Sequence, residues 1–327
     1  MKKQLLISAM LIGGAVAAWA AEPAHLTSSP YEGAEIQADG TYYLYNVETG
    51  TWLDGNDQIP YAWSATGTLN KDGFDIKLLK PDGFVGYQIF CNTTNNGSLR
   101  ANDAGPEYQF GLDAGGDPSD WIIEPKAGSV SNAYTIRVEA LDGSISEAYH
   151  LGAIWMDDLN CWTLTRDTDG TGLSTWQFVT REERLKKMVE DAKANPEGVD
   201  ATWLIPNHNM ITFNNRDTKL WKGETGWPGF VSWQNLNENV GVDENNDGIY
   251  DNDSRALVSR EAWGRTIDRY TIIEGLPEGT YSYSVSGFYR EGNPWTSEKV
   301  EGPFDNKAWY YAGATSALFM NVFDNAL

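Results

Sequence analysis

The sharpest chemical motif in the sequence is a run of acidic and amide side chains with the spacing of a calcium-binding loop. Side-chain or backbone oxygens at positions 1, 3, 5, 7 and 9 of this run would be the ligands, and they belong to Asp243, Asn245, Asp247, Ile249 and Asp251. Gly248 at position 6 suits the sharp turn of such a loop, because Ca²⁺ gathers six to eight oxygens around itself. Ser254 stands where these loops usually carry a bidentate glutamate. We expect a structural Ca²⁺ site here, with a solvated Asn/Asp turn as the alternative.

Tryptophans in polar, loop-like stretches could bind sugars. An aromatic ring packs on the apolar face of a pyranose, while a nearby carboxylate or amide bonds its hydroxyls. The candidates in the C-terminal part are Trp221, Trp227, Trp233, Trp263 and Trp295. Two weaker candidates in the N-terminal part combine a tryptophan with an acid and an amide, and they are Trp52 with Asp54 and Asn56, and Trp155 with Asp157 and Asn160. Packing in a core or under a loop is the alternative for each tryptophan.

No set of residues indicates catalysis. The three histidines, His25, His150 and His208, are isolated, and none has a second metal ligand at the usual spacing. The nucleophile elbow, the phosphate-binding glycine loop and the zinc motif of metalloproteases are absent. A glycosidase needs only two carboxylates, and the 46 acidic residues leave that alternative open. We expect a protein without catalytic activity of its own.

The elements that must position these residues are short β-type runs, and the runs repeat. Aromatic and β-branched runs begin at Tyr42, Tyr87 and Tyr134, 45 and 47 residues apart. Three units of about four strands predict a β-trefoil-like domain over residues 40–180, with an irregular sandwich as the alternative. The runs that close the three units each begin with an aromatic residue, and these are Phe74, Trp121 and Trp176.

The period then becomes helical over residues 181–195. Thr180 and Glu183 have the spacing of a capping box, which marks a helix start. We predict a linker helix whose apolar stripe docks on a neighbouring domain. The stripe consists of Leu185, Met188, Val189 and Ala192.

Residues 200–327 return to β character. Strand-like runs occur near 203–205 and 270–273, and the run 280–286 alternates cleanly after a Pro-Glu-Gly turn. We predict a β-sandwich of the jelly-roll type. The sequence stops directly after the apolar run 317–323, so we expect this sandwich to be incomplete and the chain to be a fragment of a longer protein.

The first twenty residues have the features of a secretory signal peptide. Two lysines precede an uncharged run, and small residues follow at Ala18 and Ala20. A short membrane anchor is the alternative, but the apolar run is too short to span comfortably. We therefore expect export to the periplasm, cell surface or medium, with residues 21–39 as a linker. Export would allow Cys91 and Cys161 to form a disulfide, although a free buried cysteine is equally ordinary.

The charge balance excludes two classes of partner. The net charge is −22, and it becomes −24 without the signal segment, which carries two of the basic residues and no acid. Nucleic acids and anionic membranes are bound through clustered Lys and Arg, so neither is expected as a partner. No later stretch approaches the roughly twenty apolar residues of a membrane-spanning helix.

Several phrases resemble a known group of proteins. The stretches GTYYLYNVETGTWL at 40–53, WQFVTREERL at 176–185 and DATWLIPN at 200–207 are similar to large secreted proteins of Gram-negative gut bacteria. In those proteins a ricin-lectin-like β-trefoil unit is followed by a galactose-binding-like jelly roll. The stretch IEGLPEGTY at 273–281 with SGFYR at 286–290 resembles the central strands of such carbohydrate-binding jelly rolls.

The resemblance implies an architecture better than it implies a ligand. The first unit lacks the closing tryptophan of the lectin Gln-x-Trp pattern, and serine replaces glutamine at Ser119 and Ser174 in the other two. The sugar sites of lectins therefore cannot be transferred. We expect a secreted or surface glycan-binding protein of the adhesin or lectin type, with polysaccharide or glycoprotein glycans as partners. A structural or protein-interaction spacer, or an accessory binding region of a glycoside hydrolase, is the alternative.

Overall fold

The computed structural model describes two parts of the chain to different extents. In the N-terminal part it describes residues 21–56, 64–91, 98–101, 111–113, 119–128, 130–138, 149–157, 161–167 and 170–205. Beyond these it describes 272–283 and short strand segments between 231 and 321. The signal segment, residues 1–20, lies outside the described residues.

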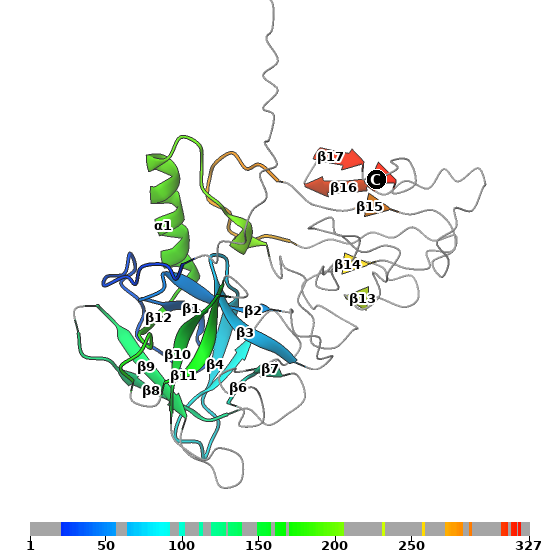
Figure 1. The fold of residues 1–327 in the computed structure, drawn as a ribbon. Coiled ribbons are helices and arrows are strands. Elements are labelled where there is room, and N and C mark those ends of the chain that lie inside the picture. The colour runs from blue at the N-terminus through cyan, green and yellow to red at the C-terminus, as the bar shows by residue number, and fades with distance from the viewer. Residues whose placement is uncertain are drawn as a thin grey trace, which may run out of the picture.

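Six strands of the N-terminal domain form a closed barrel (Figure 1). The barrel strands are β1 (Thr41–Asn46), β4 (Asp75–Leu79), β5 (Gln88–Cys91), β8 (Trp121–Pro125), β9 (Ala133–Val138) and β12 (Trp176–Val179). Antiparallel pairing runs from β1 to β4, β5, β8, β9 and β12, and β12 returns to β1. The step from β5 to β8 is a bridge between Tyr87 and Trp121. The barrel therefore leaves none of these six strands as a free edge.

Three hairpins cap the barrel. They are β2 (Thr51–Asn56) with β3 (Ser64–Asn70), β6 (Ser98–Arg100) with β7 (Gly111–Asp113), and β10 (Tyr149–Met156) with β11 (Cys161–Asp167). Strand β3 pairs with both β7 and β11, which joins the hairpins to one another. Each unit thus gives two strands to the barrel and two to the cap, which confirms the predicted β-trefoil-like domain and excludes an irregular sandwich for it.

The register shows how the three units correspond. The tyrosine that opens each unit faces the residue that closes it, and the pairs are Tyr42–Ile76, Tyr87–Trp121 and Tyr134–Trp176. On its other side, each closing residue pairs with the strand that follows around the barrel, and the pairs are Ile76–Cys91, Trp121–Val138 and Trp176–Asn46. Ile76, and not the expected Phe74, therefore stands in the place of the two tryptophans. Phe74 lies two residues earlier, before β4 begins, so an aromatic start alone was a misleading marker.

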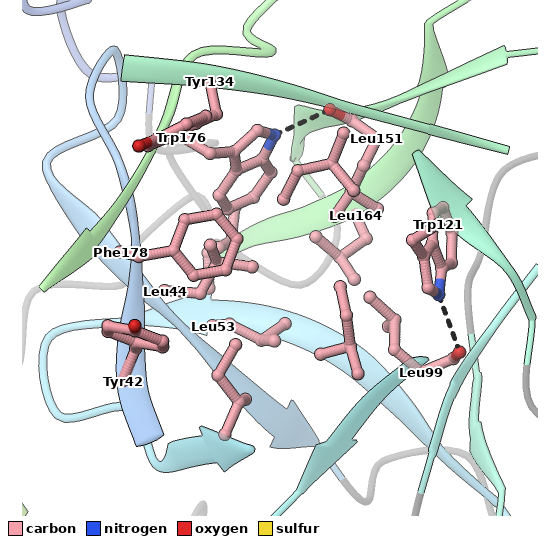
Figure 2. Close-up of a cluster of buried hydrophobic side chains, with 14 of the residues drawn as sticks. Tyr42, Leu44, Leu53, Leu99, Trp121, Tyr134, Leu151, Leu164, Trp176 and Phe178 are labelled. Carbon is pink, nitrogen blue, oxygen red and sulfur yellow. Dashed lines mark hydrogen bonds between the residues drawn. The ribbon is translucent and has the colours of Figure 1, made fainter. Parts of the chain in front are cut away.

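The core is filled by large side chains from all three units (Figure 2). Trp121 and Trp176 are fully buried, and each indole Nε1 donates to a hairpin carbonyl: Trp121 to Leu99 at 3.0 Å and Trp176 to Leu151 at 2.8 Å. In the first unit the carbonyl of Leu53 accepts the backbone N–H of Phe74 at 3.2 Å instead. The tryptophans thus bury their rings without leaving the N–H unpaired.

Helix α1 (Arg181–Ala194) follows β12 directly. The Thr180 hydroxyl accepts the backbone N–H of Glu183 at 3.2 Å, which is one half of the predicted capping box. The Glu183 carboxylate is used elsewhere, because it accepts the N–H groups of Glu32 at 2.6 Å and Gly33 at 3.1 Å. The helix docks back on the trefoil, where Leu185 and Met188 pack against buried aromatic residues.

Residues 21–39, expected as a linker, lie along the trefoil and contact it. The backbone N–H of Leu26 donates to Glu48 O at 2.7 Å, and that of Ala34 donates to Phe178 O at 2.7 Å. Ala34 also packs against the core. This segment, called the arm below, is thus bound to the domain along its length.

The C-terminal part contains short paired strands. They are β13 (Val231–Ser232) with β14 (Leu257–Val258), β15 (Phe288–Tyr289) with β18 (Met320–Asn321), and β16 (Trp309–Ala312) with β17 (Thr315–Leu318). These elements agree with the predicted β character. Their assembly into an incomplete jelly roll extends beyond the described residues and stays a prediction.

One strand expected in this part is wrong, and another is absent over the residues of it that are described. Residues Thr202–Leu204 form a 3-10 helix, η1, because the Asp200 carboxylate accepts the N–H of Thr202 at 2.9 Å and its hydroxyl at 2.6 Å and so starts a turn. The turn buries Trp203 and Leu204 in one cluster, whereas a strand would send them to opposite faces. Residues 280–283 are also outside any strand, and the Tyr281 hydroxyl donates to Pro277 O at 2.9 Å. The rest of the expected run, 284–286, lies outside the described residues.

Candidate functional site

The residues expected to bind sugar and metal in the C-terminal part lie outside the described residues. They are Trp221, Trp227, Trp233, Trp263 and Trp295 for sugar, and Asp243, Asn245, Asp247, Ile249 and Asp251 for calcium. These assignments stay predictions. The side chain of Cys91 also lies outside the described set, so the disulfide with Cys161 stays a prediction as well.

Six tryptophan side chains are described, and they fall into two groups. Five are buried, with 0% to 7% of their surface exposed: Trp52, Trp121, Trp162, Trp176 and Trp203. Trp155 is partly exposed. Because a stacking residue must show a ring face to the ligand, Trp155 is the candidate that the described structure supports.

Trp52 is excluded as a sugar-stacking residue. Its ring packs against Tyr45 at 4.7 Å between centroids, and the Arg184 guanidinium lies 4.0 Å from its centre. Its expected partner Asp54 is fully buried and accepts a hydrogen bond from the Asn70 amide. The expectation of a site at Trp52 and Asp54 is therefore wrong, because both residues are occupied by internal contacts.

Trp155 lies near the tip of the β10–β11 hairpin of the third unit. It meets Trp162 in an edge-to-face arrangement, with ring centroids 5.3 Å apart at 70°. Asp157 is exposed and begins the turn directly after β10, two residues beyond Trp155. Ile154 is 41% exposed and faces the other way. The indole Nε1 of Trp155 is buried and has no hydrogen-bond partner in the described part of the chain.

The arm adds a residue that the sequence did not reveal. The His25 ring lies 5.8 Å from the ring of Trp162, and its Nε2 contacts the Glu22 carboxylate at 2.7 Å. The side chain of His25 is 47% exposed. Trp155, Asp157, Trp162 and His25 together are called the hairpin site below. His25 lies far from the others in sequence, so only the path of the arm brings it here.

The hairpin site offers the partly exposed ring of Trp155, the exposed Asp157 after it, and the His25 imidazole against the buried ring of Trp162. Such a set can stack on a flat apolar face and bond to polar groups around it. Among the described residues no group of three His, Cys, Asp or Glu side chains could hold a metal ion. No helix in the described part is long and apolar enough to cross a membrane.

Comparison with solved structures finds two likenesses, both covering 45% of this chain. A ricin B-like lectin of Macrolepiota procera in complex with lactose is 17% identical, with a TM-score of 0.34 and 99% of that chain covered. A salivary protein from Culex quiquefasciatus of the Cysteine and Tryptophan-Rich family is 12% identical, with a TM-score of 0.36 and 97% covered. No family model and no curated protein matches the sequence. The β-trefoil assignment here rests on the strand pairing.

A second group of functional interest is a buried cation that sequence reasoning missed. Arg184 on α1 is 3% exposed and sits among aromatic rings. Burial lowers the pKa of its guanidinium to about 10, so it remains charged at neutral pH. Burial also raises the pKa of each nearby tyrosine, Tyr31, Tyr43 and Tyr45, to about 12. The apolar stripe predicted for this helix did not include Arg184, and only the surrounding rings explain a buried arginine.

Proposed function

We propose that this protein is a secreted or surface-displayed glycan-binding protein of the adhesin type, and that the hairpin site is one of its contact points. The observation that carries the proposal is the partial exposure of Trp155, two residues before the exposed Asp157, in a domain whose other described tryptophans are buried. Trp155 also packs against the core, but unlike the other five it keeps part of its side chain exposed.

The packing of the trefoil favours binding at its surface. Trp121, Trp176 and Phe178 fill the interior together with aliphatic side chains, so ligand contact must come from hairpins and loops. A ring stacked on a pyranose, with a carboxylate accepting from hydroxyls, is a shallow contact. Alone it supports affinity on the order of millimolar. Further contacts at the loop tryptophans of the C-terminal part would raise the avidity of the whole chain.

Two further parts of the proposal rest on sequence. The signal-peptide pattern in residues 1–20 supports export, where glycans of surfaces and secretions are the available partners. The spacing of oxygen-bearing residues over 243–251 supports a structural Ca²⁺ in the C-terminal part. The protein would act by binding alone, without a reaction of its own.

The test is a glycan array and affinity electrophoresis on plant and host polysaccharides with residues 21–327. We expect binding that Trp155→Ala weakens at least about fivefold, since stacking on one ring is worth about 1 kcal/mol or more. Ile154→Ala is the matched control, because it removes an exposed apolar side chain from the opposite face of the same strand.

The outcomes separate the parts of the proposal. Absence of binding by the unaltered chain in both assays would end the glycan-binding proposal. Binding that survives Trp155→Ala and Asp157→Asn would reject the hairpin site. In that case the five loop tryptophans would be changed to alanine one at a time.

A further inference from the structure

Segments far apart in the sequence meet around the side chain of Arg184. Buried residues of β1, β2 and η1 surround it in a cluster, here called the outer aromatic cluster, which lies outside the barrel core. Tyr31 of the arm and Ile273 of the C-terminal part pack against the same cluster. The members of the outer aromatic cluster are Tyr43, Tyr45, Val47, Trp52, Val179, Trp203 and Leu204.

Arg184 is held from several sides. Its guanidinium carbon lies 4.6 Å from the ring centre of Tyr43, 4.0 Å from that of Trp52 and 4.2 Å from that of Trp203. Its Nη2 donates to the carbonyls of Lys71 at 3.3 Å and Asp72 at 2.6 Å. Cation–π contacts strengthen when the cation is removed from water, so the three rings help to offset its burial. A single side chain thus joins α1 to β1, β2 and η1.

The first turn of α1 also holds the C-terminal part. The Arg181 Nη2 donates to the carbonyl of Glu274 at 2.6 Å. Gly275 has a φ of +63° and lies so close that a Cβ there would sit 3.2 Å from Arg181 Nη1. Ile273 on the other side of Glu274 packs against the outer aromatic cluster. Figure 1 shows this segment, in orange, between α1 and the strands near the C-terminus.

The covalent connection could not fix the two parts by itself. Residues 195–200 are exposed and include Pro196 and Gly198, the latter with a φ of +86°. The ion pair of Lys71 with Asp200 is also exposed, and such pairs contribute little. Within the described residues, the contacts that could fix an orientation are those of α1 and the outer aromatic cluster.

We propose that the outer aromatic cluster, closed by Arg184, is an intramolecular interface whose partner is the segment 272–276 of the same chain. It fastens the C-terminal part to the trefoil, so that the two parts move as one body. The arm, α1, η1 and segment 272–276 would then open together and not one after another. This role is independent of glycan binding.

Hydrogen exchange and small-angle scattering on residues 21–327 test the interface. Arg184→Met keeps a long apolar side chain but removes the cation. We expect amide exchange to rise about tenfold or more in α1 and in 272–276 together, because cation–π contacts and two hydrogen bonds are lost. The radius of gyration should rise with it. Lys186→Met, on an exposed position of the same helix, is the matched control and should change neither quantity.

A second variant keeps the proposal testable if Arg184→Met does not fold. Ile273→Ser removes the apolar contact of the C-terminal segment and leaves the trefoil side of the cluster intact. We expect a larger radius of gyration with unchanged exchange in β1 and β12. An unchanged radius in Ile273→Ser, or faster exchange in α1 of Arg184→Met without any change in 272–276, would overturn the proposed interface.

Discussion

Replacing Trp176 by phenylalanine tests the description of the trefoil core most directly. The indole is fully buried, and its Nε1 donates to the Leu151 carbonyl at 2.8 Å. Phenylalanine leaves that buried carbonyl without its donor, at a cost of about 1–3 kcal/mol, and leaves a small cavity worth about 1 kcal/mol more. We expect the free energy of unfolding to fall by about 2–4 kcal/mol, measured by urea denaturation followed by far-UV circular dichroism.

The pseudo-threefold register supplies both a replicate and a control for this experiment. Trp121→Phe removes the equivalent bond to Leu99 and should cost the same within about 1 kcal/mol. Ile76→Val is made at the corresponding position of the first unit, where no indole bond exists, and should cost about 0.5–1.5 kcal/mol. The reasoning fails if both tryptophan variants lose no more stability than Ile76→Val.

Further predictions concern pH, packing, metal and ligand charge. Burial raises the pKa of Tyr31, Tyr43 and Tyr45 from 10.0 to about 12. Their neutral forms therefore contribute to the stability of the folded protein fully below pH 10, and this contribution is lost as the pH rises to 12. Arg184 has a pKa lowered to about 10, so its contribution to the stability of the folded protein rises over the same pH range, but it is one group against three. Urea titrations at pH 8, 10 and 11 should therefore show a net fall in the free energy of unfolding. Gly86→Ala would place a Cβ 2.3 Å from the carbonyl oxygen of Trp121, and a fall in melting temperature that corresponds to about 1–3 kcal/mol is expected. Chelation of Ca²⁺ should lower the melting temperature of the unaltered chain but not that of Asp243→Ala. Equal changes in the two melting temperatures would reject the calcium site. Because the net charge is −22, sialylated or sulfated glycans should bind more weakly than their neutral forms at low salt, with a difference that shrinks as salt is added.

The repeating β pattern made the trefoil predictable from sequence. Tyr42, Tyr87 and Tyr134 mark the same barrel position in three units, and their spacing survives differences in loop length. The position of Ile76 was not predictable in this way, because its match to the two tryptophans depends on register and not on residue type. Only the partner strand identifies it.

The sequence could reduce the candidate sugar-binding residues of the N-terminal part to a few tryptophans, but it could not choose among them. Trp52 and Trp155 have similar neighbours, each followed by an aspartate two residues later. The difference between them is made by a residue far along the chain, since Arg184 covers Trp52 and buries it. His25 was missed for the same reason, because it is far from Trp162 in sequence and only the path of the arm brings the two rings together. The helical turn at Trp203 was missed for a local reason, the bonds from Asp200 to Thr202.

The closure of the barrel by β1 and β12 determines how the domain responds to a pulling force. Tyr43 faces Val179 across this pair, so the chain enters and leaves the trefoil at neighbouring points about 5 Å apart. The folded domain therefore adds almost nothing to the end-to-end distance of the chain, which makes it a poor spacer. Tension applied at its two ends would open β1 from β12 like a zipper, one hydrogen bond at a time. The Glu183 carboxylate accepts the N–H groups of Glu32 and Gly33 between the incoming and the outgoing chain, so these bonds must break before β1 can separate from β12.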